Sequence, residues 1–146
     1  MSFTLTIAPL AAADTDAVVA LWHRCGLTRP WNDPAGDIAF AMRGSNSTVL
    51  VARDAGAVTG SVMTGHDGHR GWVYYVAVDP DARRRGLGRR IMVAAETWLA
   101  ERGVAKAELL IRAENAAVQR FYDALGYTVE PRIVMSRWLD GRAPTS

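Results

Sequence analysis

The sequence contains a single cysteine, Cys25, among 146 residues. One thiol cannot form an intramolecular disulfide or supply a cysteine cluster for a metal, as is typical of proteins in a reducing compartment. Cys25 follows Val18 and Leu21 at helical spacing, so the pattern favours a packed, unreactive thiol over a nucleophile.

The sequence also lacks long apolar runs. No run approaches the roughly 20 residues that span a bilayer, and Met1–Thr6 contains no basic stretch before an apolar core. We therefore expect a cytoplasmic protein without a membrane partner. Hydrophobic residues make up 49% and charged residues 22% of the chain, which is typical of a packed protein. The length predicts one domain over residues 1–140, with a disordered tail over residues 141–146.

The net charge of +2 is too small to indicate a nucleic-acid-binding protein by itself, and we expect no nucleic-acid partner. The distribution of charge is informative, because five of the eight residues from Arg83 to Arg90 are arginine. A nucleic-acid-binding module is a competing interpretation of these arginines. It would need an extended basic face with stacking aromatic residues, whereas the arginines are concentrated in one short segment.

Hydrophobic periodicity predicts an α/β (α+β) fold. The predicted strands cover residues 3–7, 48–53, 57–63, 71–78 and 107–111, and two short strands lie around Pro131 within residues 128–139. The predicted helices cover residues 14–25, 33–44, 87–102 and 115–125. Turn residues at 54–56 and 67–68 indicate that the central strands run antiparallel. We therefore expect a mixed, mostly antiparallel sheet of six to seven strands with about four helices.

The segment from Arg83 to Gly88 lies where a strand ends and a helix begins. The positive end of a helix dipole disfavours nearby cations by ~0.3–1 kcal/mol each, and a glycine inside a helix costs ~1 kcal/mol relative to alanine. A bound diphosphate would offset both costs, because free backbone N–H groups and arginines both attract phosphate. The alternative is a solvated surface turn, where acidic residues would be more favourable.

Two segments resemble motifs of the GNAT superfamily of acetyl-CoA-dependent N-acetyltransferases. Residues 76–88 resemble its strand followed by Gln/Arg-x-x-Gly-x-Gly/Ala, and residues 114–127 resemble its Asn-x-x-Ala/Val-x-x-Phe-Tyr helix with a Gly-Tyr/Phe turn. Residues 29–34 and 67–71 further resemble a small, single-domain YpeA-like bacterial branch. The resemblance implies a GNAT fold whose sheet splays between strands 4 and 5.

The resemblance also implies roles for individual residues. Tyr122 would face the coenzyme sulfur and Asn115 would bind the pantetheine arm, so both are candidate catalytic residues. The acetyl-CoA-binding residues that it implies are Val76, Ala77, Val78, Arg83, Arg84, Arg85, Gly86, Leu87, Gly88, Arg89, Asn115, Gln119 and Tyr122. Helical geometry places Asn115, Gln119 and Tyr122 within about 60° of one another. Asn115 as an ordinary N-cap and Tyr122 as a half-buried core residue remain alternatives.

The expected reaction is acetyl transfer to an amine by direct attack in a ternary complex, with Tyr122 as the proton donor. The acceptor is a small-molecule or peptide amine whose identity is open. Its expected contacts are Arg29, Trp31, Asn32, Tyr74 and Tyr75. The general base is unassigned, and its candidates are Asp33, Asp37, Asp67, His66, His69 and waters held by Tyr74 and Tyr75. We expect no metal, because two histidines in one turn lack a clear third ligand.

One alternative is a non-catalytic acyl-CoA sensor with the same fold, which would bind the coenzyme without turnover. Whether the acyl group is strictly acetyl stays open. Either a monomer or a homodimer is compatible with the sequence, and an exposed edge strand would allow the latter.

Overall fold

The computed structural model describes residues 5–83 and 85–144 of the chain. It contains two compact units, Met1–Leu110 and Ile111–Ser146, and each is described by itself. The first residues of the predicted N-terminal strand, the predicted phosphate ligand Arg84 and the end of the predicted tail lie outside the described residues.

The first unit is built on a five-stranded mixed sheet with the order β1-β2-β3-β4-β5. The strands are β1 (Leu5–Pro9), β2 (Ser47–Asp54), β3 (Ala57–His66), β4 (Gly71–Val78) and β5 (Ala107–Leu109). Neighbours from β1 to β4 pair antiparallel, whereas β5 pairs parallel with β4. The parallel pairing requires a crossover, and α3 (Leu87–Glu101) provides it.

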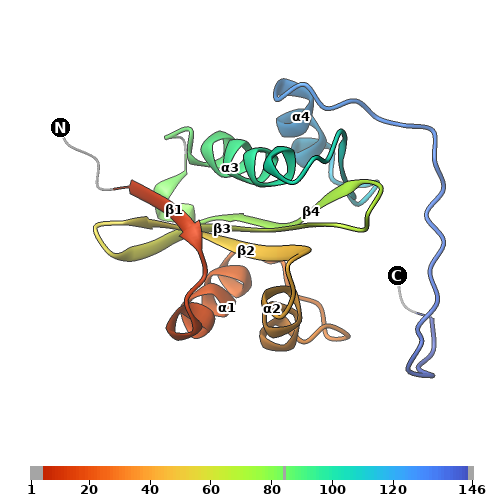
Figure 1. The fold of residues 1–146 in the computed structure, drawn as a ribbon, viewed down its shortest axis with the longest axis horizontal. Helices are drawn as coiled ribbons and strands as arrows, with labels where there is room; N and C mark the ends of the chain where they lie inside the picture. Colours follow the sequence, from red (N-terminus) through yellow and green to blue (C-terminus); the bar gives the residue numbers. More distant parts are fainter. Residues whose placement is uncertain (1–4, 84, 145–146) are drawn as a thin grey trace. The chain divides into compact units, whose positions relative to one another are not determined.

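Helices cover both faces of this sheet. α1 (Thr15–Arg24) and α2 (Pro34–Met42) lie on one face, and α3 lies on the other (Figure 1). A fourth helix, α4 (Ala116–Ala124), belongs to the second unit. The four predicted helices are thus confirmed. None of the helices in the described residues is both long and apolar enough to cross a membrane.

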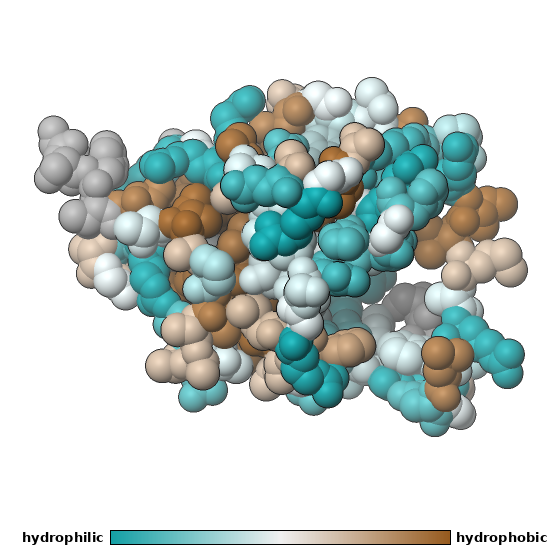
Figure 2. All heavy atoms as spheres, in the orientation of Figure 1, coloured by the Kyte–Doolittle hydropathy of each residue, from teal (hydrophilic) through white to brown (hydrophobic). Residues whose placement is uncertain are grey.

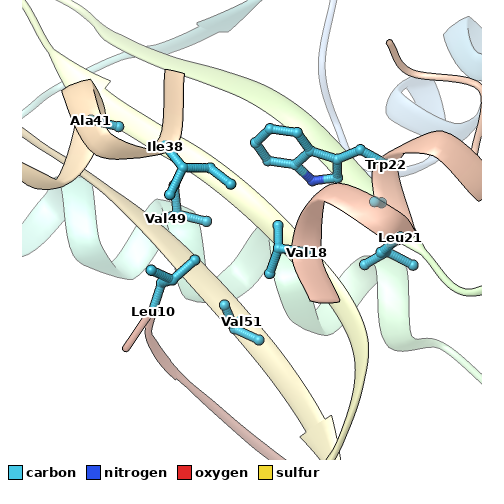
Figure 3. Close-up of a cluster of buried hydrophobic side chains, with 9 residues drawn as sticks. Leu10, Val18, Leu21, Trp22, Ile38, Ala41, Val49 and Val51 are labelled. Carbon is cyan, nitrogen blue, oxygen red and sulfur yellow. The ribbon is translucent and has the colours of Figure 1, made fainter. Parts of the chain in front are cut away.

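The core beneath α1 and α2 follows from the alternation of side chains along β2. Val49 and Val51 point to this face, where Val18, Leu21 and Trp22 of α1 meet them (Figure 3). All five side chains are at most 2% exposed. Trp22 therefore lies in the centre of the hydrophobic layer that supports the sheet.

Two glycines allow α3 to lie close to the opposite face. A Cβ at Gly60 would lie 2.4 Å from Cδ1 of Ile91, and one at Gly71 would lie 2.7 Å from Cδ1 of Leu99. Any larger residue would therefore have to displace a buried side chain of α3. These close approaches hold α3 against β3 and β4.

The prediction of six to seven strands is wrong, because residues 128–139 contain no strand. Their β-branched residues favour an extended chain, but a strand also needs a pairing partner, and Pro131 lacks a donor N–H. Ile133, Met135 and Leu139 are more than 90% exposed. Figure 2 shows hydrophilic and hydrophobic residues interspersed on the face in view.

Candidate active site

β4 contains a bulge near its C-terminal end. Its pairing with β3 shifts between Ser61 and Met63, so Tyr75 and Val76 lie opposite a single β3 residue. Tyr75 has a φ of 52°, in the left-handed region. This conformation costs a bulky residue ~1–3 kcal/mol and persists only where surrounding contacts enforce it. The bulge changes the direction of the strand just before the predicted coenzyme-binding residues.

Side chains from three other elements hold Tyr75. Its ring stacks on Trp22 of α1, with centroids 3.8 Å apart and planes 2° from parallel. Its hydroxyl donates to Oδ2 of Asp37 in α2 at 2.9 Å. Ser61 of β3 accepts from Nε1 of Trp22 at 2.8 Å and donates to the carbonyl of Tyr75 at 3.3 Å. Burial and the Asp37 carboxylate raise the pKa of Tyr75, so its phenol stays a donor.

The second half of β4 has an open edge. β5 pairs with β4 only from Gly71 to Val73, whereas β4 continues to Val78. In the described part of the chain, residues 74–78 therefore have no strand partner on the β5 side. An extended ligand can hydrogen-bond to such an edge as an added strand does. The pairing ends where the resemblance implies a splay.

Contacts with α1 hold the C-terminal end of β4. Asp79 forms an ion pair with Arg24 at 2.8 Å. Hydrogen bonds from the backbone N–H of Asp81 and from Arg24 lower the pKa of Asp79, and this carboxylate is therefore ionised at neutral pH. The carbonyl of Val78 accepts from Nε of Arg83 and from Sγ of Cys25, both at 3.3 Å.

The start of α3 has the features of an anion site. Gly86 is the N-cap with a φ of 71°, no described side chain caps the helix, and the first turn has no acidic residue. A Cβ at Gly86 would meet nothing within 4 Å, so the left-handed backbone and not lack of space favours glycine here. Buried Leu87 anchors the turn, while Arg85 and Arg89 are exposed. The free N–H groups and these cations suit a diphosphate.

In the second unit, Asn115 is the N-cap of α4, and its side chain accepts a first-turn backbone N–H at 3.2 Å. Tyr122 is only 8% exposed, and its ring meets Phe121 and Tyr127 edge-on with centroids 4.9 and 5.8 Å away. Burial raises the pKa of Tyr122 to about 12. The phenol is therefore protonated at neutral pH. Gln119 lies exposed on the same helix.

The side chains predicted to contact the acceptor differ in their exposure and in their hydrogen bonds to the protein. The guanidinium of Arg29 donates to the carbonyls of Gly26 and Thr28 at 3.1 and 2.9 Å. Trp31 and Asn32 in the same loop are partly buried. Tyr74 is 44% exposed, and partial burial raises its pKa.

Most candidate bases are engaged in local structure. Asp33 caps α2, accepting from the backbone of Gly36 at 3.1 Å. Asp67 accepts from the N–H groups of Arg70 and His69, which lower its pKa, and from Trp72. His66 accepts a backbone N–H through Nδ1. Asp37 alone contacts the β4 bulge.

Sequence patterns did not identify the contacts that support Tyr75. Trp22 follows Val18 at helical spacing, so periodicity predicts its burial. Its bond to Ser61 joins residues 39 apart in the chain, and no local pattern indicates such a contact.

Known proteins share both sequence and fold with this chain. Residues 15–127 match the acetyltransferase (GNAT) family. Acetyltransferase SG1711 of Sodalis glossinidius is 42% identical over 122 residues, covering 84% of this chain and 86% of the relative. Acetyltransferase YE1169 of Yersinia enterocolitica is 40% identical over 127 residues, covering 87% and 90% of the two chains.

Solved structures of acetyltransferases share the fold of this chain. The aminoglycoside N-acetyltransferase AAC(6')-Iy in complex with CoA has a TM-score of 0.81 at 16% identity, covering 95% of this chain and 97% of that one. The ribosomal-protein-S18-alanine N-acetyltransferase of Escherichia coli has a TM-score of 0.71 at 28% identity, covering 84% and 77%.

The family match and the sequence relatives thus define a coenzyme-dependent acyltransferase. The chain belongs to the acetyltransferase (GNAT) family. It is an N-acetyltransferase, and acetyl-CoA is its acetyl donor.

Proposed function

We propose that this enzyme transfers acetyl from acetyl-CoA to an amine by direct attack in a ternary complex. The neutral amine forms a bond to the thioester carbonyl carbon, and the carbon–sulfur bond breaks. The amine nitrogen loses a proton to a base that is not assigned, and the departing thiolate accepts a proton or a hydrogen bond. Holding both reactants together supplies several kcal/mol of the barrier without a covalent enzyme intermediate.

The observation that carries the proposal is the start of α3 at Gly86, where no described side chain caps the backbone N–H groups of the first turn. We assign the diphosphate to the N–H groups of Leu87, Gly88 and Arg89 and to the exposed side chains of Arg83, Arg85 and Arg89. The pantetheine arm would lie along the open edge of β4 at Val76, Ala77 and Val78. The carbonyl of Val78 already accepts hydrogen bonds from Arg83 and Cys25. The other backbone N–H and carbonyl groups of Val76, Ala77 and Val78 are therefore the favoured partners of the pantetheine arm.

We assign the proton donor to Tyr122. Burial raises its pKa to about 12, so the phenol is protonated at neutral pH. A thiol titrates near pH 8.5, well below this phenol, so the phenol stabilises the departing thiolate chiefly as a hydrogen-bond donor. Asn115 caps α4 through Oδ1, so its side-chain amide nitrogen is left to bind the pantetheine arm. The exposed side chain of Gln119 would bind the same arm.

The acceptor is proposed only as a class. The similar structures are named for two different acceptors, an aminoglycoside and an alanine of ribosomal protein S18. Arg29, Trp31, Asn32, Tyr74 and Tyr75 remain the proposed contacts for the acceptor. We also propose that residues 1–140 form one domain, because a single family match runs from residue 15 to residue 127.

Calorimetry with coenzyme A and pantetheine tests the phosphate site. Arg85→Ala should weaken coenzyme A binding by about five- to tenfold, since one charge-assisted contact at an exposed site is lost. Pantetheine lacks the diphosphate, so its affinity should not change. Arg43→Ala is the matched control, because Arg43 lies at the end of α2 over the ring of Phe40. Absence of coenzyme A binding at millimolar concentration would overturn the proposal.

A further inference from the structure

Asp37 is a carboxylate whose contacts do not neutralise its charge. Among the described residues, its one hydrogen bond comes from the neutral hydroxyl of Tyr75, at 2.9 Å from Oδ2. Asp14 and Asp79, by contrast, both form ion pairs with arginines. A partly exposed carboxylate held by one neutral donor keeps both its charge and a free oxygen for another partner.

The fixed position of Asp37 is as informative as its charge. Tyr75 holds the carboxylate, and Tyr75 is itself held by the Trp22 stack and by Ser61. The left-handed backbone of Tyr75 is strained, and such strain concentrates at functional sites. Val76, which follows immediately, begins the proposed pantetheine edge. The carboxylate is therefore fixed beside the strand where the thioester is proposed to lie.

The two arginines that flank α2 in the chain, Arg29 and Arg43, have other described contacts. Arg29 donates to two carbonyls of its own loop, and Arg43 lies 4.9 Å from the ring centroid of Phe40. Among the described residues no cation contacts the free oxygen, so an ammonium group of a bound ligand suits it. An ammonium bound to a carboxylate is stabilised in its charged form, so it is not the nitrogen that attacks.

We propose that Asp37 is a specificity-determining residue that binds a second, non-reacting ammonium group of the acceptor. The substrate class is then an amine that carries at least two amino groups, one neutral at the thioester and one charged at Asp37. This inference rests on the proposed acetyl transfer, and its failure is separable from failure of that function because coenzyme binding is measured independently.

The test compares 1,4-diaminobutane with butylamine, which differ by one amino group. Wild-type enzyme should prefer the diamine in kcat/KM by about five- to tenfold, since the carboxylate is partly exposed. Asp37→Asn keeps the shape and can still accept from Tyr75, so it should abolish this preference through acceptor KM. Asp33→Asn removes one charge from the same helix end and should retain the preference. Coenzyme A affinity should stay within twofold in both variants.

A second variant separates charge from the hydrogen bond. Tyr75→Phe keeps the Asp37 charge and the stacked ring, so it should retain most of the preference for the diamine. If Asp37→Asn, which keeps that hydrogen bond but removes the charge, still prefers the diamine as wild type does, the charge does not select the acceptor, and the proposal is overturned. The proposal also fails if calorimetry detects no 1,4-diaminobutane binding to coenzyme-saturated wild type, or equal binding by Asp37→Asn. Failure of wild type to bind coenzyme A would instead reject the proposed function.

Discussion

Gly60→Ala tests the close approach of α3 to the sheet. The new Cβ would lie 2.4 Å from Cδ1 of Ile91 and 3.0 Å from the carbonyl oxygen of Ala77. Ile91 is fully buried, so its Cδ1 cannot swing into solvent. Overpacking of this kind costs ~1–3 kcal/mol, and reduced unfolded-chain entropy returns ~0.4–1 kcal/mol. We expect a net loss of ~1–2 kcal/mol in the free energy of unfolding.

The clashing atom can be removed separately, which isolates the contact with Ile91. Ile91→Val deletes Cδ1 and should cost ~0.5–1.5 kcal/mol alone. In the double variant the nearest clash is gone, so its total loss should fall below the sum of the single losses by ~1 kcal/mol. Urea unfolding of the four proteins at fixed pH gives this coupling energy.

Gly44→Ala is the control for the added methyl group. Its Cβ has a nearest neighbour 4.0 Å away, so the substitution should be neutral or stabilise by up to ~1 kcal/mol. If the two losses at Gly60 and Ile91 add within ~0.5 kcal/mol, the contact does not limit the position of α3. A Gly60→Ala protein as stable as wild type would lead to the same conclusion.

Three further measurements address chemistry and electrostatics. Tyr122→Phe should lower kcat by about a hundredfold or more while coenzyme A affinity changes less than twofold, and an unchanged kcat would remove Tyr122 from proton transfer. Gly86→Ala should weaken coenzyme A binding because alanine disfavours the left-handed N-cap, whereas circular dichroism should show the fold intact. The hydrogen bond from Arg53 lowers the pKa of Asp14 below its ordinary value of 3.8. The ionised carboxylate therefore stabilises the fold above about pH 4, and this stabilisation is lost as the pH falls through the lowered pKa. Urea midpoints from pH 2 to 6 should therefore rise less steeply in Asp14→Asn than in wild type.

Local sequence patterns predict the central elements of the fold well. Glycines and acidic turn residues place the hairpins between β2, β3 and β4, and apolar spacing predicts α1 and α3. The same propensities mislead at residues 128–139, because strand formation depends on a partner that propensity does not encode. Periodicity describes which side of an element is buried, but it does not indicate whether a neighbouring strand is present.

The part of the candidate site that depends on local sequence was also predictable. The uncommon combination of arginines and glycines at a helix start points to an anion without any knowledge of distant residues. The bulge at Tyr75 gives no such signal, since a bulky aromatic residue is a poor choice for a left-handed backbone. Its conformation depends on Trp22, Asp37 and Ser61, which lie in three other elements.

The last turns of α1 explain how one helix can organise both ends of the proposed coenzyme strand. Trp22 supports the bulge before Val76, while Arg24 binds Asp79 just after Val78. Cys25 donates to the carbonyl between them. Because three residues within the four-residue segment from Trp22 to Cys25 make these three contacts, a rotation of α1 would shift the whole strand segment together and would not bend it. The burial of Val18 and Leu21 opposes that rotation, so core packing on one face of the sheet stabilises the backbone geometry of the proposed coenzyme strand.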